Sequence, residues 1–477
     1  MDRYRDIPPE AGPLQQNLDA RKQALYQQTD QRLQEVDAQL PAEVKEATEI
    51  EHPTLAQLPV FMAQLKERAR KAEEEAMLQA KQRLPDTQAY DAQRPTGPES
   101  FYKIRDAIQQ QQGQLHPGQE ESLYQLYRLG VAGQNPALRL SGQPNAELRE
   151  WVIAKLAQDR DFSGCDLTGA DLSELDFSGA NLTRTMMESA NLSLTILDNA
   201  TLTQTLLART QMKQTSLRHA VLNEATLALA NCSDCDFTGA DLNTLVTEGA
   251  QFERCNFRQA TLSNQVFDDT SLTDCDFSAA SLDNIIFNAI PLENPDFSSA
   301  KMYKTSFIDC QLHQAVFAEA VLQRCSMNHC QADDIDFTRA NLENCAFASA
   351  TSLERASFSH ARLQQCNLRY VPLTEANMSF AMLEGCDLSG AGLQSANLYR
   401  LQASSSLFIR TNLERANLRQ ANLIGCRLQK SRLIGSDLTT ANLFRADISQ
   451  AEMDDTTLMQ DAWTKQLKIY PLHKGVA

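Results

Sequence analysis

The sequence predicts a solenoid of five-residue repeats that follows an α-helical region, and three observations carry this prediction. A bulky apolar residue stands at every fifth position from Phe162 to Phe347 and, displaced by one residue, from Leu353 to Leu458. Two positions before nearly every one of them stands a small residue, most often alanine. Residues 1–160 lack this period and show apolar residues at helical intervals instead.

A five-residue period fits neither of the common regular structures. A helix would spread it around its whole circumference, and a flat strand would turn alternate repeats to opposite faces. Both apolar positions must therefore face one interior, with the polar residues between them in water. The two registers hold 38 and 22 repeats, and the residue inserted around Thr351 and Ser352 predicts a bulge or small loop.

The number of repeats per coil follows from the phenylalanines. If residues 20 positions apart stack on each other, side chains of the same kind should recur at that spacing. Stacked aromatic rings stabilise each other beyond the effect of their burial. One ladder contains Phe257, Phe277, Phe297, Phe317 and Phe337, and a second contains Phe267, Phe287, Phe307 and Phe347, with Met327 in its gap. The spacing predicts four repeats per coil and two aromatic faces, and it assigns these rings to the core rather than to a cofactor site.

The stretch "DFSGCDLTGADLSELDFSGANL", which starts at Asp161, resembles the A(D/N)LXX pattern of pentapeptide-repeat proteins. The resemblance extends over residues 161–458 and implies an all-β, right-handed quadrilateral β-helix with one repeat on each side. Sixty repeats would then form about 15 coils, and a strand spacing of about 4.8 Å gives a tower about 72 Å long.

Four segments are expected along the chain. Residues 1–145 form an α-helical, Gln-rich N-terminal region, 146–160 a capping helix, 161–458 the β-helix with its one-residue slip near 351, and 459–477 a C-terminal cap or tail. Helices are expected within 14–40, 55–84, 99–112, 120–129 and 145–158.

The capping helix is expected to cover the first coil of the solenoid. The end coil of a solenoid exposes its core and its strand edges, so a terminal element must cover it. Trp151, Val152 and Leu156 are the apolar residues expected to cover the first coil.

Composition excludes several classes of protein. The formal net charge of −17 argues against nucleic acid and anionic membranes as partners. The chain has no apolar run near 18 residues and no export signal at its start, so we expect a cytoplasmic bacterial protein, or one secreted by a signal-peptide-independent route.

The cysteines are expected to be packing residues. Eleven of the 12 stand at the small inward position and Cys232 stands at a bulky one, so cysteine replaces alanine in the interior. Free thiols in this number indicate a reducing compartment. The CSDC segment ending at Cys235 imitates half a zinc site, but both thiols belong to interior columns, and we expect no metal.

No catalytic site is expected. The common nucleotide-binding, hydrolase and metalloprotease motifs are absent, and a convex tower offers no pocket in which carboxylates would acquire shifted pKa values. The four histidines of the repeats all take outward positions: His219, His313, His329 and His360. The sequence therefore predicts a protein that is not an enzyme and carries no cofactor.

Surface charge suggests where a protein partner could bind. Residues 161–360 contain 27 acidic and 11 basic side chains, whereas residues 361–450 contain 6 acidic and 10 basic ones. The candidate surfaces are an acidic stripe of Asp268, Asp269, Asp274, Asp276 and Asp283 and a basic cluster of Arg400, Arg410, Arg415, Arg419, Arg427, Lys430 and Arg432.

Three functions compete. A helical region before a pentapeptide tower resembles accessory proteins of bacterial type VI secretion, which implies an adaptor for a spike component or an effector. The alternatives are a DNA mimic that binds gyrase or topoisomerase, which resembles quinolone-resistance pentapeptide proteins, and a secreted pentapeptide-repeat effector. As a DNA mimic, the tower would carry a sparse negative charge over residues 161–360 and a net positive charge over residues 361–450. Helices that only cap and solubilise the tower, and self-association through the N-terminal helices or the C-terminal end, also remain open.

Overall fold

The computed structural model describes residues 98–112, 117–348 and 350–470. The helices expected within 14–40 and 55–84 lie outside the described residues. The chain divides into two compact units, Met1–Gln93 and Arg94–Ala477, and the structural description concerns the second.

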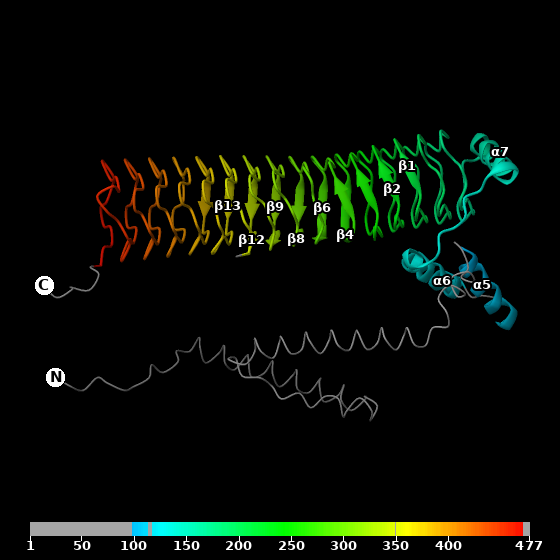
Figure 1. Ribbon diagram of the computed structural model, residues 1–477, viewed down its shortest axis with the longest axis horizontal. Coiled ribbons are helices and arrows are strands. Elements are labelled where there is room, and N and C mark those ends of the chain that lie inside the picture. The colour runs from blue at the N-terminus through cyan, green and yellow to red at the C-terminus, as the bar shows by residue number, and fades with distance from the viewer. Residues whose placement is uncertain (1–97, 113–116, 349, 471–477) are drawn as a thin grey trace, which may run out of the picture. The chain divides into compact units, whose positions relative to one another are not determined.

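The second unit is a β-solenoid that follows a group of helices (Figure 1). Parallel bridges join residues about 20 positions apart from Asp161 and Asn181 to Asp447 and Lys468, so each coil contains four repeats. The predicted β-helix with a helical region before it is confirmed.

The regular elements are short. The helices are α5 (Glu99–Gln112), α6 (Pro117–Gly130), the 3-10 helix η1 (Val131–Gly133) and α7 (Gly142–Gln158). The strands are β1 (Gln211–Lys213), β2 (Asn231–Ser233), β3 (Gln251–Glu253), β4 (Thr261–Asp268), β5 (Ser271–Thr273), β6 (Ser281–Asn288), β7 (Lys301–Tyr303), β8 (Ser306–Ile308), β9 (Val321–Gln323), β10 (Ser326–Asn328), β11 (Asn341–Glu343), β12 (Ala346–Phe347), β13 (Arg362–Gln364) and β14 (Met382–Glu384). The strands of the described residues pair in parallel. One sheet has the order β1-β2-β3-β5, and a second sheet contains the other strands.

The polar positions of the repeat make its turns. The residue before the bulky one is often Asp or Asn, and its side chain accepts the backbone N–H two residues on, as Asp176 does from Ser178 at 2.8 Å. The second residue after the bulky one has positive φ, for example 59° at Asn199. Gly and Asn adopt this conformation at low cost, and the hydrogen-bonded coils above and below hold other residue types in it.

The four sides of the tower are named here by their inward residues. Face A carries Phe257 and Phe277, face B carries Leu262 and Leu282, face C carries Phe267 and Phe287, and face D carries Phe252 and Leu272. All of these side chains are buried. Rings stack along faces A and C, with centroids 4.8 Å apart for Phe257–Phe277 and 5.1 Å apart for Phe267–Phe287. The predicted ladders are present.

The register slips twice. Asn341 pairs with Arg362, 21 residues on, which is the slip expected near 351. A second extra residue near the C-terminus makes Asp437 pair with Leu458. Leu458, predicted to be inward, is therefore 51% exposed, and Met459 packs against the core instead. The bridges continue to Lys468, so the segment predicted as a cap or tail from 459 begins as further solenoid.

Helix α7 covers the first coil. It starts at Gly142, earlier than the predicted 146, and it places Val152 in the core. The Trp151 ring meets Phe162 edge to face at 6.0 Å, and Arg149 donates to the backbone carbonyls of Asp171 (2.9 Å) and Ser173 (2.7 Å). These contacts satisfy part of the strand edge that the first coil would otherwise expose. None of the helices within the described ranges is long and apolar enough to cross a bilayer.

All twelve cysteines are free thiols, and all but Cys165 are buried. Several of the buried sulfurs lie near a backbone carbonyl of the preceding coil, as Cys235 Sγ does with Met212 O at 3.2 Å.

Candidate functional site

Helices α5 and α6 pack against the outside of face C near its N-terminal end. The outward positions of this face carry apolar residues where the rest of the tower is mostly polar. Met186, Leu206, Ala208 and Ala228 form one hydrophobic cluster with four residues of the helical segment, Phe101, Tyr124, Tyr127 and Val131. Leu206 and Ala228 are completely buried although they point away from the core of the tower. The tower thus binds a helix through an apolar stripe on its outer surface.

Tyrosine hydroxyls fix the helices to the turns of the tower. Tyr124 Oη donates to the carbonyl oxygen of Gln204 at 2.6 Å, and Tyr102 Oη donates to Asp166 Oδ2 at 2.8 Å. The guanidinium of Arg128 donates to the Glu224 carbonyl oxygen. Each contact pairs a polar atom at the rim of the apolar stripe, so the helices are held in one position.

A buried ion pair lies at the centre of this contact. The Glu188 carboxylate is 1% exposed, and it accepts hydrogen bonds from Arg209 Nη1 (3.0 Å) and Tyr127 Oη (2.7 Å). Arg209 also donates to the carbonyl oxygens of Val131 (3.0 Å) and Ala132 (3.1 Å). Burial, together with the Glu188 charge, raises the pKa of Tyr127 well above its usual range, so its hydroxyl stays a donor.

The helical region predicted as a single segment, residues 1–145, is therefore divided. Its part from Pro98 onward belongs to the same compact unit as the tower. Amphipathic periodicity identified α5 and α6 but not the surface on which they pack. The signal that could have found it is apolar residues at outward positions 20 apart, such as Met186 and Leu206.

A hollow of about 400 Å³ lies between α5, α6 and the first coils. Two of its charged groups pair with each other: Arg184 Nη1 lies 2.6 Å from Glu121 Oε2, and the guanidinium carbon of Arg184 lies 4.6 Å from the Tyr124 ring centre. Arg184, which lines the hollow, is therefore already engaged by groups of the protein.

The predicted acidic stripe is not one surface. Asp268 follows the inward residue of face C, Asp269 is the next turn residue, Asp283 lies on face B, Asp274 is the turn residue after face D, and Asp276 lies on face A. Asp268 and Asp269 are consecutive at the corner between faces C and D, Asp274 and Asp276 flank Cys275 at the corner between faces D and A, and Asp283 lies apart on face B, because each step of five residues moves to the next side of the tower. Asp276 also lies 3.5 Å from Arg258.

The predicted basic cluster is divided in the same way. Arg410 and Lys430 are turn residues after face C, Arg427 is on face C and Arg432 on face D, whereas Arg400, Arg415 and Arg419 adjoin face A. All seven side chains are exposed. Arg419 lies 3.5 Å from Asp437, and Arg432 lies 3.1 Å from Glu452, so part of the charge is neutralised locally.

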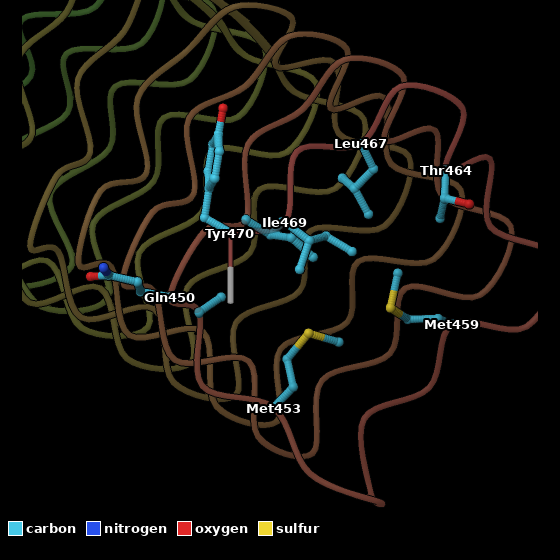
Figure 2. A pocket seen from close by; sticks show the side chains of 9 residues that line it. Gln450, Met453, Met459, Thr464, Leu467, Ile469 and Tyr470 are labelled. Carbon is cyan, nitrogen blue, oxygen red and sulfur yellow. The ribbon is translucent and has the colours of Figure 1, made fainter. Parts of the chain in front are cut away.

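The C-terminal end differs from the N-terminal end. A hollow of about 400 Å³ opens at the last coil, and Figure 2 shows Met453, Met459, Leu467 and Ile469 around it. Met453 and Ile469 are exposed, whereas the first coil lies under α7.

The histidines take the outward positions expected for them. His219, His313, His329 and His360 are exposed, and His360 stacks on the Phe380 ring at 4.8 Å. Over the ranges that the structure describes, no group of three or more His, Cys, Asp or Glu side chains is arranged to hold a metal ion.

Comparisons with known proteins concern the tower. A family described as pentapeptide repeats (8 copies) matches within residues 161–288 and 396–458, and one described as a pentapeptide repeat region matches residues 300–377 and 335–414. Together these matches cover more than half of the chain. No curated protein sequence matches it.

Solved structures with the same repeat include the plasmid-mediated fluoroquinolone resistance protein QnrB1, with 23% identity over 39% of this chain and 87% of that one and a TM-score of 0.31. HetL, a pentapeptide repeat protein involved in heterocyst differentiation in the cyanobacterium Nostoc, is 23% identical over 60% of this chain and 94% of HetL, with a TM-score of 0.16. A pentapeptide repeat protein of the Arabidopsis thaliana thylakoid lumen is 30% identical over 21% of this chain and 66% of that protein, with a TM-score of 0.14. TM-scores this low carry no functional argument.

Proposed function

Because the chain belongs to the pentapeptide repeat family, we propose that it is a non-enzymatic scaffold for protein–protein interaction. The observation that carries the proposal is the contact of α5 and α6 with face C. There the tower holds helices through an outward apolar stripe around the buried pair of Glu188 and Arg209. The same kind of contact would serve a helix of another protein.

The geometry of the polar groups supports the same function. The histidines are exposed, and Arg184 in the hollow beside α5 pairs with Glu121. General acid–base catalysis needs a donor or acceptor held within hydrogen-bond reach of a bound substrate. The described surface of the tower offers exposed charged side chains and an apolar stripe on face C, which suit a macromolecular partner.

The finer proposal is an adaptor of bacterial type VI secretion, which would join a spike component or an effector to a second protein. Its support is the arrangement of a long region with helical sequence periodicity before a pentapeptide tower. A rigid tower keeps two binding sites at a fixed distance, and an adaptor requires two sites.

Mimicry of DNA towards gyrase is the alternative. The excess of acidic residues in 161–360 favours it, and the excess of basic residues in 361–450 opposes it. Some acids are neutralised by neighbouring arginines, as Asp234 is by Arg254 at 2.7 Å. A mimic would need an unbroken negative surface along its length.

Affinity capture from a lysate of the native host tests these functions. The intact chain and a chain that starts at Arg94 are compared at low and high salt, with purified gyrase as a separate probe. Cutting at 94 keeps α5 and α6 on the tower. We expect the intact chain to retain two specific proteins, one of which is lost with residues 1–93. Capture of gyrase by both chains with steep salt dependence would establish the mimic, and capture of no protein would reject the scaffold.

A further inference from the structure

The apolar stripe on face C continues beyond the helices that cover it. The outward residue that precedes the inward one is Met186, Leu206, Thr226, Val246, Val266 and Ile286 in successive coils, and Ile308 extends the row from the other outward position. Bridges pair Met186 with Leu206, Leu206 with Thr226, and Val266 with Ile286, so these residues form a row along the axis. The next partner of Ile286 is Ser306, and Ile308 lies beside the end of the row, in the column of Asn288 on the side toward face D.

Coverage of the row changes abruptly. Met186 is 6% exposed and Leu206 is fully buried because α6 packs on them, whereas Val266 is 51% exposed. Val246 packs on the edge of the helical cluster and lies between these extremes. In Figure 1, β4 and β6, which carry Val266 and Ile286, lie further along the tower than α6. The part of the row that begins at the half-covered Val246 and ends in the coil of Ile308 spans three coil spacings, about 14 Å or nearly three helical turns.

The two rims of this uncovered row differ in charge. On the side toward face D lie Glu248, Asp268, Asp269 and Asp309, all exposed. On the side toward face B the turn residues are Thr244, Asn264, Asn284 and Lys304. A helix seated on the row would thus meet acids along one edge only.

We propose that the row of Val246, Val266, Ile286 and Ile308 binds an amphipathic α-helix of a partner protein, with basic side chains along the edge that faces Asp268, Asp269 and Asp309. The apolar face of that helix replaces the water now on Val266, as α6 does on Leu206. This inference rests on the proposed scaffold function and names the chemistry of one partner. It also gives a role to two of the acids singled out in the sequence.

Fluorescence anisotropy with the intact chain tests the proposal. The probe is a labelled 20-residue alanine-based helix with leucines three and four apart and lysines along one edge, and its matched version carries glutamates there. We expect the lysine helix to bind more tightly, and Val266→Asp to weaken it about tenfold or more, because a carboxylate would be buried against leucine. Val321→Asp is the matched control, since Val321 holds the same place in its repeat on face B, and it should change the affinity less than about twofold.

The acidic rim has its own test. Replacing Asp268, Asp269 and Asp309 with asparagine should weaken the lysine helix and flatten the dependence of its affinity on salt. Equal binding of the two probes, or equal effects of Val266→Asp and Val321→Asp, would overturn the proposal. If the intact chain still captures its partners in that case, the scaffold function stands and only the surface is wrong.

Discussion

Phe257 and Phe277 are 20 residues apart in the chain, and their rings lie parallel within 4°, with centroids 4.8 Å apart. The same distance recurs between Phe237 and Phe257. Each inward side chain is thus fixed by the coil above and the coil below, so an interior position has little freedom to accept a larger residue.

The first prediction concerns this packing. Ala340 is 1% exposed and abuts neighbouring coils, so Ala340→Phe should cost roughly 1 to 3 kcal/mol and lower the melting temperature. Arg339→Ala is the control, because its exposed guanidinium is only 3.6 Å from an exposed Glu319 carboxylate. Calorimetry that showed equal shifts for the two variants would contradict the interior assignment.

The second prediction concerns the docked helices. Arg209→Met would leave the buried Glu188 carboxylate without its counter-charge, at a cost of about 3 to 5 kcal/mol. Hydrogen exchange should then show loss of amide protection in α6 while the tower keeps its own. Arg254→Met, which breaks an exposed pair with Asp234, should leave α6 unchanged. Unaltered protection of α6 in Arg209→Met would show that the ion pair does not hold the helices.

The third prediction concerns the thiols. Only Cys165 is partly exposed, and burial raises the pKa of Cys426 to about 12, so its thiolate is scarce at neutral pH. An aromatic disulfide reagent should label at most Cys165 quickly in the native protein and all twelve cysteines after denaturation. Cys165→Ser should abolish the fast phase. Rapid labelling of several thiols in the native protein would mean that the interior of the tower, where the cysteines stack, opens readily to solvent.

The fourth prediction concerns acid. Hydrogen bonds from the Ser178 hydroxyl and backbone N–H lower the pKa of Asp176, and the Ser163 N–H lowers that of Asp161. A lowered pKa in the folded state stabilises the tower above the unfolded value of about 3.9, and the benefit is lost as pH falls through the folded value. Replacing Asp161 and Asp176 with asparagine keeps a side-chain oxygen that can accept the turn hydrogen bond but removes the ionisable carboxyl group.

Acid titration followed by circular dichroism should therefore show the double asparagine variant unfolding at a lower pH than the natural chain. Asn191 already accepts the Ser193 N–H at 3.2 Å, which shows that the amide fits this position. Asp283→Asn is the control, because Asp283 follows an inward residue and its carboxylate does not accept a turn N–H as Asp161 and Asp176 do. An unchanged midpoint in the double variant would contradict the role of these carboxylates.

The fifth prediction concerns the C-terminal end. Met453 and Ile469 are exposed around the hollow of the last coil, so we expect the intact chain to self-associate there in a concentration-dependent way. Met453→Asp with Ile469→Asp should shift sedimentation equilibrium toward the monomer. Gln466→Asp, on the exposed outer side of the same coil, should not. A monomer at all concentrations would remove this surface from consideration.

Much of the fold follows from the sequence because the period is strict. The spacing of Phe257, Phe277 and Phe297 gives four repeats per coil, and the apolar residue Val152, in the last helical segment before the repeats, gives the cap. The second slip could not be placed, because Leu458 and Met459 are adjacent apolar residues and either could face inward. A turn in which the Thr457 N–H donates to the Asp454 carbonyl at 3.1 Å selects Met459.

The surfaces were harder to predict than the core. Asp268, Asp274 and Asp283 are near one another in the sequence, but five-residue steps distribute them over different sides of the tower. Residues on one side recur every 20 positions, so surface patches must be sought at that spacing. Val266 and Ile286 become visible as part of a row only in this way, and the packing of α5 and α6 over the beginning of that row could be recognised only from the structure.

Site-specific photo-crosslinking tests the central claim most directly. Benzoylphenylalanine is placed at Val266, and at Val321 as the control, in the intact chain in a lysate of the native host, and the crosslinked peptides are sequenced. We predict that position 266 crosslinks to a segment of a partner protein with apolar residues three and four apart and basic residues along one edge, and that position 321 does not. Equal yields at the two positions, or crosslinks from 266 confined to residues 1–97 or to a second copy of this chain, would contradict it.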